Sequence, residues 1–142
     1  MNWSDFIDFI IKHLIELIIA GFSVSFITYF IIKPYMRYLN LREELSVVLY
    51  KNAPIAHNTG LSQQSYNDTY DELRRMGGEI TGFINSTKLE IFMRLLKVPD
   101  KNDMNDAIKK LNRIMNSLNR PYMLTQIFKD HQRIYEIFKI EH

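Results

Sequence analysis

The sequence lacks cysteine, a strong net charge and any internal repeat. With no cysteine among its 142 residues, the chain cannot form a disulfide, a thiolate metal site or a cysteine nucleophile. The formal net charge of +2 is too small to predict nucleic-acid binding. Residues 43–142 hold 14 basic and 13 acidic side chains, because four of the 18 basic and three of the 16 acidic ones precede them. We therefore expect no nucleic-acid partner.

Catalytic and metal-binding motifs are also missing. None of the four histidines lies in an HExxH or similar metal-ligand spacing: His13, His57, His131 and His142. The chain contains no GxSxG motif and no phosphate-binding glycine loop, and Gly77-Gly78 lies in a helical pattern with no preceding strand. The sequence therefore predicts no enzyme activity, no cofactor and no metal.

The most distinctive feature present is a long apolar run near the N-terminus. Leu14 to Ile32 is 19 residues long, and Glu16 is its only charged side chain. A helix needs roughly 20 residues to cross a hydrocarbon core. Aromatic side chains, which favour the headgroup region, lie near both ends of the run: Trp3 before it, and Tyr29, Tyr35 and Tyr38 around its end. Pro34 lacks a backbone N–H and is expected to kink or end the helix.

A cleaved signal peptide is the main alternative to a retained anchor. Such a peptide has a positively charged start and a shorter apolar core, whereas here Asp5 and Asp8 precede a longer run. We therefore expect residues 1–34 to form a transmembrane anchor and residues 35–142 to form a separate helical domain.

The charges that flank the run predict its orientation. Residues 33–42 contain Lys33, Arg37 and Arg42 and no acid, whereas the N-terminal tail sets Lys12 and the α-amine against two aspartates. Basic residues beside a span stay on the cytoplasmic side. The sequence thus predicts a single-pass protein of the cell inner membrane, with its N-terminus outside and its C-terminal domain in the cytosol.

The anchor carries a polar stripe. At 100° per residue, one narrow face of the helix holds Asp5, Asp8, Lys12, Glu16 and Ser23. Asp8 and Lys12 are spaced for an i,i+4 pair, and so are Lys12 and Glu16. In one interpretation Glu16 lies shallow enough to reach the headgroups, to pair with Lys12 or to be protonated. In the other, the stripe faces a second helix or a wet lumen, because intramembrane charges usually face protein or water.

A second face of the anchor carries small side chains: Gly21, Ser25 and Thr28. Gly21-x-x-x-Ser25 is a small-xxx-small pattern, which permits two helices to approach closely in a membrane. We take self-association through this face as a hypothesis.

The second domain shows helical spacing throughout and no sustained period-two alternation. Helices are expected over 35–50, about 62–97, about 103–118 and from about 121 onwards. A polar loop between Pro54 and Gly60 and the Val98-Pro99-Asp100 break separate them, and Asp103 is the predicted N-cap of the third. Gly77, Gly78 and Gly82 either allow close packing or break the second helix. The predicted fold is all-α, one membrane span followed by a small cytosolic bundle of four or five helices.

Two charged groups of this domain are most simply interpreted as solvated faces. Glu72 and Glu79 share a helix face beside two arginines, which favours surface ion pairs over a metal or acid–base pair. Lys109, Lys110 and Arg113 form a small basic cluster. It is either a plain solvated face or a contact with anionic headgroups.

Four stretches of the chain stand out together: LREELSVVLYKNAPIAHNTG (41–60), YDELRRMGGEI (70–80), KVP (97–99) and DAIKKLNRIMNSL (106–118). They resemble a family of small, uncharacterised bacterial membrane proteins. The resemblance implies one N-terminal span and a cytosolic helical domain, and it implies no activity, cofactor or catalytic residue. Gly77 and Gly78 depart from it, and the helix from Pro121 to His142 looks like an addition.

These features lead to two functional hypotheses. The first is an interaction protein whose cytosolic domain self-associates or docks a partner protein, with the strongly apolar C-terminal helix as the expected docking surface. The alternative is an oligomerising, membrane-perturbing effector of a phage-defence or toxin system, in which the polar stripe lines a wet interface. Both hypotheses have the lipid bilayer as a partner.

Overall fold

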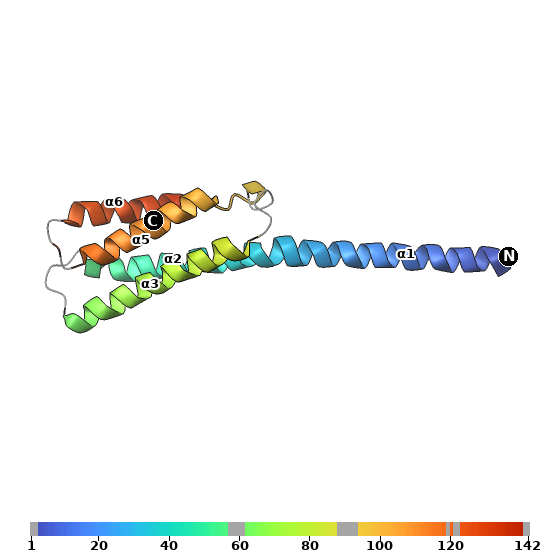
Figure 1. Ribbon diagram of the computed structural model, residues 1–142, viewed down its shortest axis with the longest axis horizontal. Helices are drawn as coiled ribbons and strands as arrows, with labels where there is room; N and C mark the ends of the chain where they lie inside the picture. The colour runs from blue at the N-terminus through green and yellow to red at the C-terminus, as the bar shows by residue number, and fades with distance from the viewer. Residues whose placement is uncertain (1–2, 57–61, 88–93, 119, 121–122, 141–142) are drawn as a thin grey trace.

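The computed structural model describes residues 3–56, 62–87, 94–118, 120 and 123–140. The side chains of residues 4, 5, 55 and 56 are not among the described ones. Within the described part of the chain every regular element is a helix, so the predicted all-α class is confirmed. Figure 1 shows a small bundle at one end of a long helical rod.

One continuous rod joins the apolar N-terminal run to the bundle. It consists of α1 (Trp3–Ile27), a π-helical turn η1 (Thr28–Ile32) and α2 (Lys33–Ala56). The helix does not end at Pro34, because the rod runs through it, and the irregularity at this point is the π-helical turn immediately before it. Just before it, the Lys33 N–H donates to the Thr28 carbonyl, an i→i+5 bond that widens the turn. A widened turn accommodates a ring that would otherwise clash with the carbonyl four residues earlier.

The bundle is an up-down-up-down arrangement of four helices. α2 runs away from α1, α3 (Gln63–Ser86) returns, α5 (Lys101–Ser117) runs away again and α6 (Leu124–Phe138) returns (Figure 1). α2 contacts α3 and α6, while α5 contacts α3 and α6, so the ring of helices is closed. We call the end beside α1 the near end (residues 33–40, 83–87, 94–101 and 136–140). The far end comprises residues 49–56, 62–72, 114–118, 120 and 123–129.

Helix boundaries differ from the predicted ones for local reasons. Asp100, not Asp103, caps α5, because its side chain accepts hydrogen bonds from the N–H groups of Asn102 and Asp103, both at 2.9 Å. The Val98-Pro99 break before it is confirmed. α2 runs past Pro54 to Ala56, so the predicted loop begins later, and its residues 57–60 lie outside the described part. α6 begins at Leu124, whereas Pro121 and His142 lie outside the described residues.

The helices enclose one hydrophobic core at the expected spacing of three and four residues. α3 contributes Leu73, Met76, Ile80 and Phe83, and α6 contributes four further apolar side chains, Ile127, Ile134, Ile137 and Phe138. Gly77, Gly78 and Gly82 do not break α3. A Cβ at Gly77 or Gly78 meets nothing within 4 Å, so neither glycine serves close packing.

Candidate membrane anchor and the bundle end beside it

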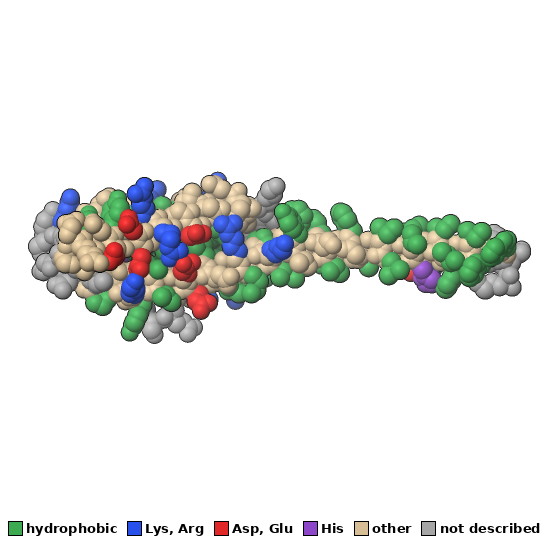
Figure 2. Space-filling view, turned by 90° about the horizontal axis from the view of Figure 1, so that it is seen from below, with side chains coloured by type: hydrophobic (Ala, Val, Ile, Leu, Met, Phe, Trp, Pro, Cys, Tyr) green, Lys and Arg blue, Asp and Glu red, His purple; other side chains and the backbone are tan. Residues whose placement is uncertain are grey.

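α1 is apolar on nearly all sides, and none of its described side chains is buried by the rest of the chain. Leu17 is 73% exposed and Phe22 is 74% exposed, although both are large apolar side chains. Figure 2 shows hydrophobic side chains along the rod and charged ones over the bundle. In the described chain this is the one helix long and apolar enough to be a candidate membrane span. A core helix of a soluble protein would be buried instead.

The polar stripe lies on α1, and its closest side-chain contact differs from the predicted pairs. Glu16 Oε2 lies 3.0 Å from His13 Nδ1, three residues earlier, and not against Lys12. Neither predicted i,i+4 pair is formed among the described side chains of α1, and Asp5 is not one of them. Ser23 donates to the Ile19 carbonyl at 2.8 Å, which satisfies its hydroxyl within the helix. His13 therefore joins the stripe as a partner that the spacing of acids and lysines did not indicate.

The small-residue face lies opposite the polar stripe. At about 100° per residue, Gly21, Ser25 and Thr28 cluster about 180° away from Lys12 and Glu16. All three small residues are exposed, and a Cβ built at Gly21 meets nothing within 4 Å. The two faces can therefore not both meet the same neighbouring helix, which separates the two functional hypotheses geometrically.

Two of the three flanking cations also hold the near end together. Arg37 Nη1 donates to Ser86 Oγ at 2.8 Å, at the last residue of α3. Arg42 Nη2 donates to the Lys139 carbonyl just beyond α6. Both cations thus meet helix C-termini, where the helix dipole favours positive charge. Lys33 instead lies 5.3 Å from the centre of the Tyr29 ring and is exposed.

Tyr38, predicted as an interfacial aromatic, belongs to the bundle core. It is 4% exposed, and its ring lies 6.1 Å from that of Phe83 and 6.3 Å from that of Phe138. Burial raises the pKa of its hydroxyl above the ordinary value. The prediction fails because Tyr38 already faces α3 and α6 at the point where α2 enters the bundle.

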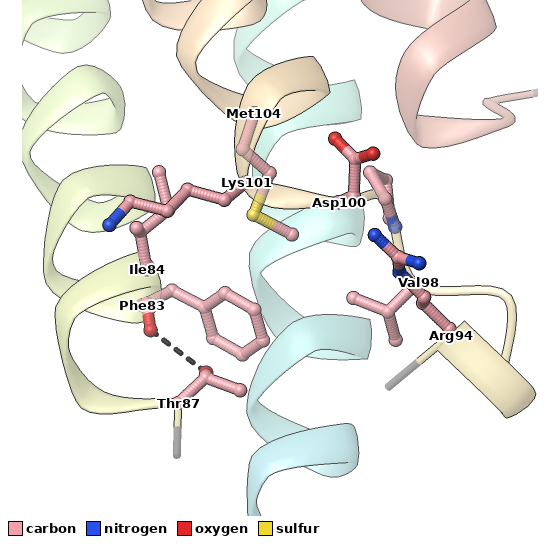
Figure 3. Close-up of a pocket in the computed structure, with 9 residues that line it drawn as sticks. Phe83, Ile84, Thr87, Arg94, Val98, Asp100, Lys101 and Met104 are labelled. Carbon is pink, nitrogen blue, oxygen red and sulfur yellow. Dashed lines mark hydrogen bonds between the residues drawn. The ribbon is translucent and has the colours of Figure 1, made fainter. Parts of the chain in front are cut away.

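A small pocket opens at the near end between α3 and α5. Its cavity is about 40 Å³ and is lined by Phe83, Ile84, Thr87, Arg94, Val98, Pro99, Asp100, Lys101 and Met104. In Figure 3 Phe83 and Met104 lie toward its centre, while Lys101 and Arg94 lie at opposite edges. The pocket thus combines an apolar floor with a charged rim, in which Asp100 accompanies the two cations.

Arg94, Lys97 and Lys101 lie at the bundle end beside α1, which local periodicity did not indicate. They are about 60 residues from the apolar run, and only the antiparallel order of the helices brings the 94–101 segment to the near end. The alternation of helix and break in the sequence could have revealed this, because each second connection of an up-down bundle returns to the same end.

Buried polar side chains elsewhere are occupied in helix packing. Asp130, 1% exposed, lies on α6 with its Oδ1 near the cations of two α5 side chains, Lys110 Nζ at 3.8 Å and Arg113 Nη1 at 3.4 Å. Lys110 and Arg113 of the predicted basic cluster therefore reach toward α6, although Arg113 stays exposed, as does Lys109. Among the described residues no group of three or more His, Cys, Asp or Glu is placed to hold a metal ion.

A second buried network links α2 to α3. Asn52 donates to Glu72 Oε2 at 2.7 Å and accepts from the Thr69 hydroxyl at 3.0 Å. Hydrogen bonds from Lys51 and Asn52 hold the pKa of Glu72 below its ordinary value. Glu72 does make an ion pair, but with Lys51 of α2 and not with the neighbouring arginines that the sequence indicated. Asn52 lies just beyond the predicted helix 35–50.

The C-terminal helix does not offer the expected docking surface. Ile127, Ile134, Ile137 and Phe138 are buried against the other helices, and of its large apolar side chains Phe128 is 58% exposed. Most of its large apolar side chains are therefore packed in the core of the bundle.

No known family, curated protein or solved structure matches the chain. The resemblance to small bacterial membrane proteins therefore stays a prediction.

Proposed function

We propose that the chain is a single-span inner-membrane protein whose cytosolic helical bundle is a self-associating module. The observation that carries this proposal is the contrast within one rod. α1 exposes its apolar side chains on every side, while α2, its direct continuation, is half-buried in a closed bundle. An exposed apolar helix of this length is stable in lipid and costly in water.

The flanking charges support an orientation with the N-terminus outside. Lys33, Arg37 and Arg42 lie on the bundle side of the rod, and the bundle end beside them adds further cations. Because the positive-inside rule counts lysine and arginine near the span, both groups favour a cytosolic bundle.

Two surfaces support self-association between identical copies. In the candidate span, Gly21, Ser25 and Thr28 permit close helix approach. On α2, Met36, Val47 and Tyr50 share the outward face and are 51%, 60% and 80% exposed. Parallel copies that meet through their spans bring their α2 helices close together, so the apolar α2 face is positioned to extend the same contact.

Cysteine cross-linking tests this proposal cleanly, because the chain has no native cysteine. Single cysteines at Gly21, Ser23, Ser25 and Thr28 are oxidised in native membranes, and dimers are read on a denaturing gel. We expect dimers from positions 21, 25 and 28 and few from position 23, on the opposite side. A protein that extracts from membranes at alkaline pH, or that forms no dimer from any position, contradicts the proposal.

Labelling from outside tests the orientation. A membrane-impermeant maleimide added to intact spheroplasts should label a cysteine at Trp3, which is 75% exposed, and not one at Tyr50. Lysis should make Tyr50→Cys reactive. The reverse pattern contradicts the proposed topology.

The polar stripe favours a second candidate, an oligomeric membrane-perturbing effector of a phage-defence or toxin system. All its described members, Asp8, Lys12, Glu16 and Ser23, are exposed along one side of α1. In that case Ser23→Cys should cross-link instead of Gly21→Cys, expression should permeabilise cells, and Lys12→Leu with Glu16→Leu should abolish dye leakage. Unchanged leakage in this double variant contradicts the second candidate.

A further inference from the structure

We propose that the near end of the bundle docks on anionic lipid headgroups of the bilayer in which α1 sits. This rests on the proposed function, because it requires α1 to cross the membrane. It adds a second membrane contact, made by the bundle itself through Arg94, Leu95, Lys97 and Lys101.

Charge is distributed unequally between the two ends of the bundle. The near end carries six basic side chains and two acidic ones, whereas the far end carries three of each. The near-end basic side chains are Lys33, Arg37, Arg94, Lys97, Lys101 and Lys139.

Both near-end acids are already engaged. The Asp100 side chain accepts hydrogen bonds from the backbone N–H groups of Asn102 and Asp103, and Glu136 Oε2 lies 3.3 Å from Arg133 Nη1. The surplus of cations therefore remains available to an anionic surface, which attracts basic side chains within roughly one Debye length, about 8 Å.

The rod fixes the distance between this charged end and the end of the proposed span. α1 continues into α2 without a linker, and Arg37 lies four residues after Lys33. At 1.5 Å per residue this is about 6 Å of helix, comparable to the depth of a headgroup layer. Figure 1 shows the turn at 94–97 beside the start of α2, at the end of the bundle nearest α1. A continuous helix thus holds the cations at the level where lipid phosphates lie.

An exposed leucine marks the centre of the contact. Leu95 is 73% exposed and lies between Arg94 and Lys97, while Leu96 packs against the core and holds the turn in place. Lys97 has a φ of 59°, a left-handed conformation that ends the turn. An apolar side chain between cations is suited to a membrane interface, where it inserts below the phosphates that the cations bind.

The test uses the full chain reconstituted in lipid nanodiscs, with a single labelled cysteine in the cysteine-free background. An environment-sensitive fluorophore is placed by Leu95→Cys at the near end, by Tyr50→Cys at the far end, or by Ile18→Cys in α1. The discs contain phosphatidylcholine alone or phosphatidylcholine with phosphatidylglycerol, and brominated lipid serves as the quencher.

We expect a several-fold rise in quenching at position 95 when anionic lipid is present, and a loss of that rise at high salt. Position 50 should respond to neither change, and position 18 should be quenched in both lipids. The variant Arg94→Gln, Lys97→Asn, Lys101→Gln should lose most of the rise, asparagine being chosen because it tolerates the left-handed conformation. The matched control Arg74→Gln, Lys109→Gln, Lys129→Gln removes three exposed cations elsewhere and should keep it.

The outcomes separate this inference from the proposed function. Quenching at position 18 without an anion-dependent rise at position 95 overturns the docking contact and leaves the span intact. An equal loss in the two triple variants also overturns it, because net charge alone would then explain the effect. If position 18 is not quenched in either lipid, the proposed span fails, and the docking contact fails with it.

Discussion

α1 and α2 are two halves of one continuous helix, yet they are built for different surroundings. α1 carries large apolar side chains on nearly every side and keeps them exposed, whereas α2 buries one face, with Leu45 and Leu49 fully buried. The helical backbone is the same in both halves. The difference shows that side-chain distribution around the helix, and not helix formation itself, makes one half a candidate membrane span and the other part of a protein core.

The sharpest test of this comparison applies one substitution to the bundle core, in α6, and one to α1. Phe138→Ala removes a fully buried ring from the core, and we expect it to destabilise the bundle by about 3–5 kcal/mol. Phe22→Ala removes a ring of the same size from α1, where it is 74% exposed, and should leave bundle unfolding unchanged. Thermal and denaturant unfolding in detergent, followed by circular dichroism, measures both. Equal losses would mean that α1 packs against the bundle.

A polar substitution sharpens the comparison within α2. Asn52→Ala removes the partner of Thr69 and one donor to Glu72 in a buried network, so we expect a loss of about 1–3 kcal/mol. Asn40→Ala on the exposed side of the same helix is the matched control, and it should change stability by less than about 0.5 kcal/mol. Similar effects from both would contradict a structural role for the network.

Sequence periodicity predicted much of this molecule, and its failures have two causes. The helices, the apolar run and core positions such as Leu73 and Leu111 follow from local spacing. The π-helical turn before Pro34 and the cap at Asp100 are local features that hydrophobic spacing does not encode. The burial of Tyr38 and the pairing of Asp130 depend on which residues meet across the bundle. Arg94 and Lys101 come to the end of the bundle beside α1 only through the order of the helices. A local pattern carries no information on such meetings, so the near end emerged from the structure.

Glycine substitutions in α3 and α1 test the same comparison with a smaller expected effect on stability. Gly78→Ala adds a methyl group to an exposed helical position with nothing within 4 Å, so we expect a gain of about 0.5–1 kcal/mol in bundle stability. Gly21→Ala meets equally open space within the chain, and it should leave bundle unfolding unchanged. If copies pack through the face of Gly21, the much larger side chain of Gly21→Ile should weaken dimer cross-linking through Ser25→Cys. Undiminished cross-linking would show that a second helix does not approach closely there.

The smallest expected effect concerns the α2–α3 contact at the far end and depends on pH. Hydrogen bonds from Lys51 and Asn52 lower the pKa of Glu72 in the folded chain, so the folded state binds its proton less readily than the unfolded state. The stabilisation by Glu72 is therefore fully present above its ordinary pKa of 4.5 and is lost as the pH falls through the lower, folded value.

We expect the melting temperature of the wild type to exceed that of Glu72→Gln at pH 7, and the difference to shrink below pH 4.5. Because Glu72 lies near the surface, the effect should remain below about 1 kcal/mol. In a Lys51→Met background the difference should fall but persist, since Asn52 still donates to Glu72. A difference that grows on acidification would contradict the sign of the shift. A difference unaffected by Lys51→Met would assign the stabilisation to Asn52 alone, placing it in the buried face of α2 and not at its surface.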